Sequence, residues 1–273
     1  MTGRLTHEGA PYAPSSFPAI RKAAVELIRG RDAEADPALE MAVSHAVLRR
    51  ASRGEIPGAL RIFRPSPMVA FGRRDANRPG FPAAVRACRD AGFTPVVRAS
   101  GGRAVACTSS ALVVDHVQRD PESLGGMDAR FEDFGAMLAG VLRDFGVDAR
   151  VGEVPGEYCP GAHSVNAHGT RKLIGTAQRM VKDAWLFSSI VQYDDAATLQ
   201  PLLGDVYAAL ELEFNPHSVG AVTHEAPGVT LDDLEQAIIG AYDDRFGLVE
   251  STIDEATVAA ARGMVEDHSV QAE

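Results

Sequence analysis

The chain is poor in cysteine, carries more acid than base and has no long apolar run. Its 273 residues include three cysteines, an odd number that does not suggest a disulfide framework, so we expect a reducing cytoplasm in which each stays a thiol. The 27 Lys and Arg residues against 37 Asp and Glu give a formal charge of −10 without a basic run, so nucleic acid is not an expected partner. No apolar stretch approaches the roughly 18 residues that span a bilayer. The first residues also lack the charged segment followed by an apolar segment that is typical of a signal peptide. We therefore expect no membrane partner.

What is present is the composition of an ordinary soluble globular protein, with 45% hydrophobic and 23% charged residues. A chain of this length can bury a sizeable core, and neither an internal repeat nor a Pro/Gly/Ser linker divides it. We therefore predict a mobile polar tail over residues 1–20, a main domain over 21–250, and a C-terminal helix with a tail over 251–273.

Apolar residues at helical spacing predict several helices. The clearest lie over 36–54, 81–93 and 129–147. Two later helical patterns open with capping-like pairs, Thr230 with Asp233 and Thr252 with Glu255.

Short apolar runs separated by turn residues predict strands. They lie at 23–30, in a hairpin over 58–75 broken by Pro65 and Pro67, in three strands within 94–117, and in two strands over 170–193. Helices thus interleave with hairpins instead of alternating strictly with single strands. This order predicts an α+β fold with a mixed, mostly antiparallel sheet flanked by helices.

The stretch "RASGGRAV" (98–105) places two adjacent glycines between predicted strands. Such a turn lets the backbone approach a ligand closely, and its N–H groups can hold an oxyanion or a phosphate. Arg98 would add a charged clamp. The alternative is a hairpin turn with a solvated arginine.

The stretch "TRKLIGTAQR" (170–179) places Lys172 in a strand among apolar or small residues. Its ammonium either points to water from an edge strand or turns inward, where it could neutralise a developing oxyanion or accept a proton. Gly175, Thr176 and Ala177 are small enough for a substrate to lie against the strand.

The stretch "GEYCPGAHS" (156–164) places Cys159 in a loop between glycine and proline, which argues against simple core packing. No CxxC or CxxxH pair accompanies it, so no metal site is expected. His163 and His168 are candidates for ligands or, more simply, for surface and hydrogen-bonding residues. A nucleophilic thiol would need an activator, and the ammonium of Lys172 is one candidate.

Together, "GALRIFRPSPMVAFGRRD", "VVRASGGRAV" and "RKLIGTAQR" resemble, in order and rough spacing, the lipoate-protein ligase and octanoyltransferase family. That family shares its catalytic fold with biotin protein ligases. The resemblance covers roughly residues 23–193, with weaker support onward to 214–222. It implies a biotin/lipoate protein ligase catalytic domain over 21–250, with a tunnel for a medium-length acyl chain between the glycine loop and the lysine strand.

Some members of that family use ATP to activate lipoate, whereas others move an octanoyl or lipoyl group between proteins through a cysteine thioester. The "EYCPG" loop and the "IGTAQR" strand are similar to the second group, in particular to amidotransferases of Gram-positive type. The ligases carry a His-Asp pair after the glycine loop, where this chain has "ACTSS" (106–110). The resemblance therefore implies a transferase that needs no cofactor; the alternatives are a ligase that needs ATP and Mg, and a non-catalytic acyl-binding paralogue.

The resemblance also implies roles for individual residues. Cys159 would attack the acyl carbonyl, and Lys172 would lie by the carbonyl oxygen and favour the thiolate. The residues implied to bind substrate are Arg73, Arg98, Ser100, Gly101, Gly102, Gly175, Thr176 and Ala177. The implied partners are lipoyl-domain acceptors, such as the glycine-cleavage H protein or E2 subunits of 2-oxoacid dehydrogenases. A basic patch of Arg73, Arg74 and Arg78 could receive such a domain, or could be a solvated loop.

Overall fold

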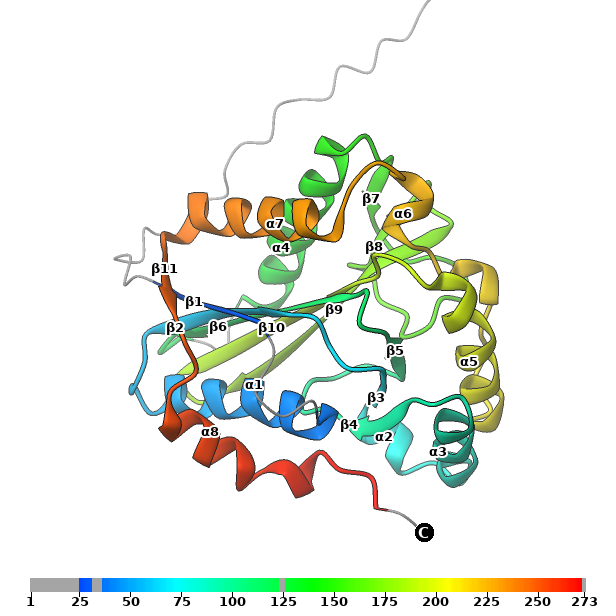
Figure 1. The fold of residues 1–273 in the computed structure, drawn as a ribbon, viewed down its shortest axis with the longest axis horizontal. Helices are drawn as coiled ribbons and strands as arrows, with labels where there is room; N and C mark the ends of the chain where they lie inside the picture. Colours follow the sequence, from blue (N-terminus) through cyan, green and yellow to red (C-terminus); the bar gives the residue numbers. More distant parts are fainter. Residues whose placement is uncertain (1–24, 31–35, 123–125, 272–273) are drawn as a thin grey trace, which may run out of the picture.

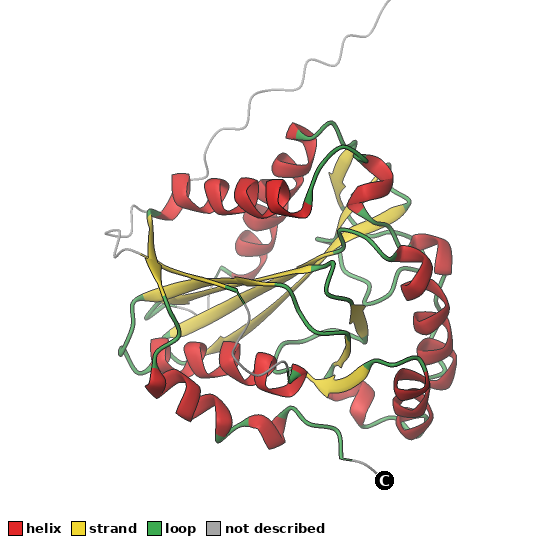
Figure 2. Ribbon diagram, in the orientation of Figure 1, coloured by secondary structure: helices red, strands yellow, loops and turns green. Residues whose placement is uncertain are grey.

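The computed structural model describes residues 25–30, 36–122 and 126–271. The tail predicted for residues 1–20 lies outside the described residues. The chain forms one large twisted sheet with helices on both faces, and a small second sheet lies beside it (Figures 1 and 2). This is the predicted α+β class.

The large sheet is mixed and mostly antiparallel, as predicted. Its eight strands within the described residues follow the order β11 (Leu248–Ser251), β1 (Val25–Arg29), β2 (Gly58–Phe63), β6 (Leu112–Arg119), β10 (Ala184–Val191), β9 (Arg171–Val181), β8 (Val165–Ala167) and β7 (Ala149–Val151). In this order β1 runs parallel to both of its neighbours, β11 and β2, whereas every neighbouring pair from β2 onward to β7 is antiparallel.

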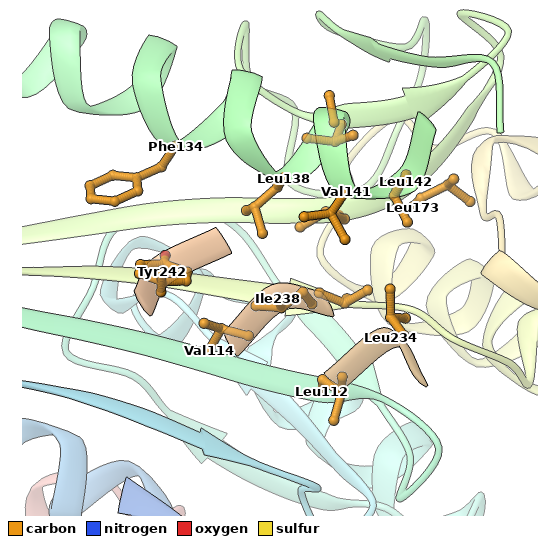
Figure 3. Close-up of a cluster of buried hydrophobic side chains, with 14 of the residues drawn as sticks. Leu112, Val114, Phe134, Leu138, Val141, Leu142, Leu173, Leu234, Ile238 and Tyr242 are labelled. Atoms are coloured by element: carbon orange, nitrogen blue, oxygen red, sulfur yellow. The ribbon is translucent and has the colours of Figure 1, made fainter. Parts of the chain in front are cut away.

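Both faces of the large sheet are apolar because successive side chains of a strand point to opposite faces. Leu27 and Leu60 join the core on one face, and Ile28 and Ala59 join the core on the other. The first face is covered by α4 (Met127–Asp144) and α7 (Leu231–Phe246), and the second by α1 (Pro37–Ser52) and α8 (Glu255–Arg262) (Figure 1). Figure 3 shows side chains of α4 and α7 packing onto the strands.

The small sheet carries the glycine stretch. Its strand order is β4 (Thr94–Val97), β3 (Met68–Phe71) and β5 (Val105–Cys107), and its core packs against α3 (Phe81–Asp90) and α5 (Ala196–Ala209). The hairpin predicted over 58–75 is wrong. Strand β2 is already paired on both edges, by β1 and β6, so the chain crosses through the Pro65–Pro67 connector into the second sheet.

The remaining elements close the ends of the fold. They are α2 (Arg73–Ala76), the 3₁₀ helix Pro216–Ser218, α6 (Val222–Glu225) and the 3₁₀ helix Val265–Asp267. Thr230 and Asp233 form the predicted capping box of α7. The second cap was predicted at the wrong residue, because Asp254, rather than Thr252, accepts from the Thr257 N–H. No helix in the described ranges has the length and apolar character needed to cross a bilayer.

Candidate functional site

Cys159 lies in the loop that joins β7 to β8, and its backbone is held in an unusual conformation. Its φ of 45° is in the left-handed region, which non-glycine residues seldom adopt. Its backbone N–H donates to the Tyr207 hydroxyl at 2.6 Å, and that hydroxyl donates to the Ala104 carbonyl at 3.0 Å. Tyr207, on α5 (Ala196–Ala209), therefore ties the cysteine to the glycine stretch just before strand β5.

The sulfur of Cys159 lies directly against the glycine stretch. It accepts a hydrogen bond from the backbone N–H of Arg103 at 3.2 Å, and Nη2 of Arg98 lies 3.6 Å away. Gly102 has φ of 100°, and a Cβ atom built there would lie 2.6 Å from the sulfur. The missing side chain is what allows the two loops to meet. Backbone N–H and guanidinium donors in this position can stabilise negative charge on the sulfur or on a bound oxyanion.

Arg98 is buried and holds the glycine stretch in shape, which excludes the solvated alternative. Its Nη1 donates to the Ala70 carbonyl at 2.8 Å, its Nε to the Gly101 carbonyl at 3.0 Å, and its Nη2 to the Arg103 carbonyl at 2.6 Å. One guanidinium therefore links strand β3 to both ends of the turn.

Lys172 turns inward, with 1% of its surface exposed. Its ammonium donates to the carbonyls of Cys159 at 2.8 Å and Tyr158 at 3.0 Å, and pairs with the Glu157 carboxylate at 3.3 Å. The structure thus brings Lys172 to Cys159, with the ammonium on the cysteine carbonyl. The donors that contact the sulfur belong to Arg98 and Arg103.

A mostly apolar cavity of about 300 Å³ opens beside the sulfur. The stacked rings of Phe131 and His163, with centroids 5.1 Å apart and planes at 5°, form part of its wall. Its lining residues are Gly101, Gly102, Met127, Phe131, Cys159, Pro160, Gly161, Ala162, His163, Ser164, Thr176, Ala177 and Gln178.

Four of the predicted substrate-binding residues, Gly101, Gly102, Thr176 and Ala177, therefore line the cavity, as does Cys159. Gly175 lies instead beside the Lys172 side chain, where a Cβ atom would be 3.3 Å from Cε. Ser100 is buried next to the turn but does not line the cavity.

Other predicted residues lie elsewhere. Arg73 is exposed at the start of α2, and the cavity lining does not include it. Arg78 of the proposed basic patch donates to the Leu210 carbonyl at 2.7 Å and so braces the end of α5. His168 is at the turn between β8 and β9, where its ring contacts Asp148 and Glu225.

The other two cysteines do not reach the cavity. Burial raises the pKa of the Cys88 thiol to about 12, and it also raises the pKa of the fully buried Cys107 thiol. The thiolate is the reactive form of cysteine. Cys159, which is partly exposed, is therefore the candidate nucleophile among the three.

Sequence reasoning missed three side chains of this site. Glu157 stands two residues before Cys159, but nothing in a single sequence shows that a loop glutamate is buried. Tyr207 comes from a segment for which no helix was predicted, and Phe131 was predicted only as part of a helix. The available signal was only that a charged residue, Glu157, stands two positions before Cys159, which does not show that it is buried.

Comparison with known proteins gives one consistent result. Residues 36–242 match the family model described as the lipoyl protein ligase A/B catalytic domain. An octanoyl-[GcvH]:protein N-octanoyltransferase of Geobacillus kaustophilus is 27% identical over 147 residues, 54% of this chain and 52% of that protein. A lipoyl-[GcvH]:protein N-lipoyltransferase of Listeria monocytogenes is 26% identical over 140 residues, 51% of this chain and 50% of that protein.

Among solved structures, the fold is similar to a lipoate-protein ligase A bound with ATP. The TM-score is 0.72 at 20% identity, over 89% of this chain and 94% of that one. This similarity is to the fold alone. The chain spans about half the length of the curated relatives it matches.

Proposed function

The chain belongs to the family of lipoyl protein ligase A/B catalytic domains, and from that premise we propose that it transfers an octanoyl or lipoyl group through a thioester on Cys159 to a lysine of a lipoyl-domain protein. The observation that carries this proposal is the position of the Cys159 sulfur. It lies at an apolar cavity and accepts from the Arg103 N–H, which is the arrangement an acyl-transferring thiol needs.

In the first half-reaction, the Cys159 thiolate attacks the carbonyl carbon of an acyl-lysine amide on the donor protein. The C–S bond forms, the C–N bond breaks, and the departing amine takes up the proton that the thiol released when it became a thiolate. The Arg103 N–H and the Arg98 guanidinium are the donors available to the tetrahedral oxyanion. Burial of an eight-carbon chain, at about 0.8 kcal/mol per methylene, would help to position the carbonyl.

In the second half-reaction, the ε-amine of the acceptor lysine attacks the thioester. A new C–N bond forms, the C–S bond breaks, and the proton of the amine returns to the sulfur. Amide is exchanged for amide, so the overall reaction is nearly isoenergetic and requires no ATP. We propose the H protein of glycine cleavage as donor and E2-type lipoyl domains as acceptors. The relatives' names support the first of these, because they specify GcvH.

The alternative is ATP-dependent ligation. That reaction would need a cation beside the phosphate of an acyl adenylate. The Lys172 ammonium is already ion-paired with the Glu157 carboxylate and donates to two carbonyls at 1% exposure, so it is not free to serve that phosphate. This geometry favours the transferase.

One assay distinguishes the hypotheses. The purified protein is mixed with an unmodified E2 lipoyl domain and either octanoylated H protein or octanoate with ATP and Mg, and the mass of the acceptor is measured. A transferase acylates the acceptor from the H protein alone, and a ligase does so only from octanoate with ATP. If neither mixture acylates the acceptor but octanoate binds, the protein is a non-catalytic acyl binder.

A further inference from the structure

We propose that Glu157 is the positioning residue of the Cys159 centre, acting through Lys172. This inference rests on the proposed acyl transfer and adds to it a residue that the chemistry depends on without touching the substrate. Glu157 is 1% exposed, so its carboxylate lies entirely inside the protein. A carboxylate in such a place is costly unless it is paired and hydrogen-bonded.

The Glu157 carboxylate joins the two ends of the loop that carries Cys159. Its Oε1 atom accepts from the backbone N–H of Gly161 at 3.0 Å and from the Ser164 hydroxyl at 2.9 Å. These bonds run from the residue before Tyr158 to residues on the far side of Cys159. The cysteine therefore sits on a turn whose two ends are joined by one side chain.

The second carboxylate oxygen fixes Lys172. Oε2 lies 3.3 Å from Nζ, and the two carbonyls at 158 and 159 take further donors of the same ammonium. The ammonium donates hydrogen bonds to the two carbonyls, and its contact with Oε2 is an ion pair. The Lys172 ammonium is thereby directed to the peptide groups on either side of the Cys159 Cα atom.

The backbone of Cys159 is therefore held on both of its sides. The Cys159 N–H is held by Tyr207 and its carbonyl by Lys172. A left-handed conformation in a non-glycine residue costs of order 1–3 kcal/mol and persists only where the surroundings enforce it. With both sides of the residue fixed, the sulfur is directed at the Arg103 N–H and at the cavity.

The negative charge of Glu157 is the feature to test, because Glu157→Gln keeps the shape and an acceptor for Gly161 and Ser164. The experiment measures the rate of acyl-Cys159 formation by intact mass in single turnovers, against the concentration of octanoylated H protein. We expect Glu157→Gln to lower the maximal rate by at least about tenfold and to change the half-saturating concentration by less than about threefold. Glu235→Gln, which neutralises an ion-paired carboxylate on α7 outside the cavity lining, is the matched control and should stay within about threefold of wild type in both.

A double-mutant cycle with Lys172→Met tests whether Glu157 acts through the lysine. In the Lys172→Met background, Glu157→Gln should lower the rate by less than about twofold, because the ammonium that it positions is gone. The double variant also removes both buried charges together, so it remains measurable if Glu157→Gln alone folds poorly.

Three results would overturn the inference. The first is that Glu157→Gln forms acyl-Cys159 at the wild-type maximal rate, and the second is that Glu157→Gln lowers this rate by the same factor with and without Lys172. The third is that the lower rate of Glu157→Gln returns to the wild-type value once it is divided by the fraction of protein with a titratable Cys159 thiol. A wild-type protein that forms no acyl adduct contradicts the proposed function itself and is distinguishable from all three.

Discussion

Gly102 and Cys159 meet so closely that no side chain fits between them. A Cβ atom on Gly102 would lie 2.6 Å from the cysteine sulfur and 2.6 Å from Nη2 of Arg98, and the backbone there has φ of 100°. Two segments more than fifty residues apart in sequence thus form a single site through the absence of one side chain. Gly101, its neighbour, has open space at the same position.

This difference predicts that Gly102→Ala abolishes most acyl transfer, by at least about a hundredfold, because the added methyl displaces the sulfur from the Arg103 N–H. Gly204→Ala, on α5 outside the cavity lining, where a Cβ atom also meets open space, should retain activity within about threefold. Steady-state transfer rates of the two variants, with circular dichroism as the check on folding, provide the comparison. Equal activity in both variants would contradict the close approach.

Tyr207→Phe should remove a hydroxyl that serves two backbone groups. The Cys159 N–H and the Ala104 carbonyl both lose their partner, which costs about 1–3 kcal/mol for each group left unsatisfied. We expect a lower free energy of unfolding in urea and a drop of roughly tenfold in the maximal transfer rate. Tyr193→Phe, whose hydroxyl bonds the Val229 carbonyl away from the site, is the control and should leave transfer unchanged.

Phe131→Ala should enlarge the cavity beside Cys159, because the Phe131 ring and the His163 ring stacked on it form part of its wall. We expect the ratio of the transfer rate with a decanoyl donor to that with an octanoyl donor to rise by about tenfold, because the enlarged cavity accommodates the additional methylenes of the longer chain. Phe145→Ala, at the other end of α4 and outside the cavity lining, should leave this ratio unchanged. No change in Phe131→Ala would show that the chain does not lie against this ring.

Stability should fall in mild acid because of buried histidines. Burial lowers the pKa of His116 to about 3, below the unfolded value near 6.5, so the unfolded state takes up a proton first as the pH falls. Stability present above about pH 6.5 is then lost progressively toward pH 3, by at most about 1.4 kcal/mol per pH unit for this group. His116→Phe should flatten the slope of the unfolding free energy between pH 7 and 4, and His217→Gln, at an exposed position, should not.

Part of the slope should remain in His116→Phe, because burial also lowers the pKa of His45 to about 4. A slope identical to that of the wild type would show that His116 binds a proton as readily in the folded protein as in the unfolded chain, which contradicts the lowered pKa.

The sequence predicted the parts of the site that depend on local chemistry. Each of Cys159, the glycine pair and Lys172 also allowed a non-functional interpretation on its own; the resemblance of their three stretches to one family predicted them as one site, and the structure brings them together. The hairpin over 58–75 was wrong because sheet membership depends on distant pairing partners, which a Pro-x-Pro connector does not reveal.

The contacts between individual side chains of the candidate site could not be predicted from the sequence. The expected place of Lys172 beside an acyl carbonyl stays a prediction; its pairing with a buried Glu157 depends on how the loop packs and could not be read from the sequence. Tyr207 contributes from a helix whose pattern was not identified, almost fifty residues beyond the cysteine. These contacts are long-range and are decided by tertiary packing.

The central claim is that Cys159 carries the acyl group. The most direct test is the intact mass of the wild-type protein after incubation with octanoylated H protein in the absence of ATP, before and after treatment with hydroxylamine. We predict one hydroxylamine-labile octanoyl adduct on Cys159, and none on Cys159→Ser. Full acyl transfer by Cys159→Ala, or an equal adduct on Cys159→Ser, would contradict the account.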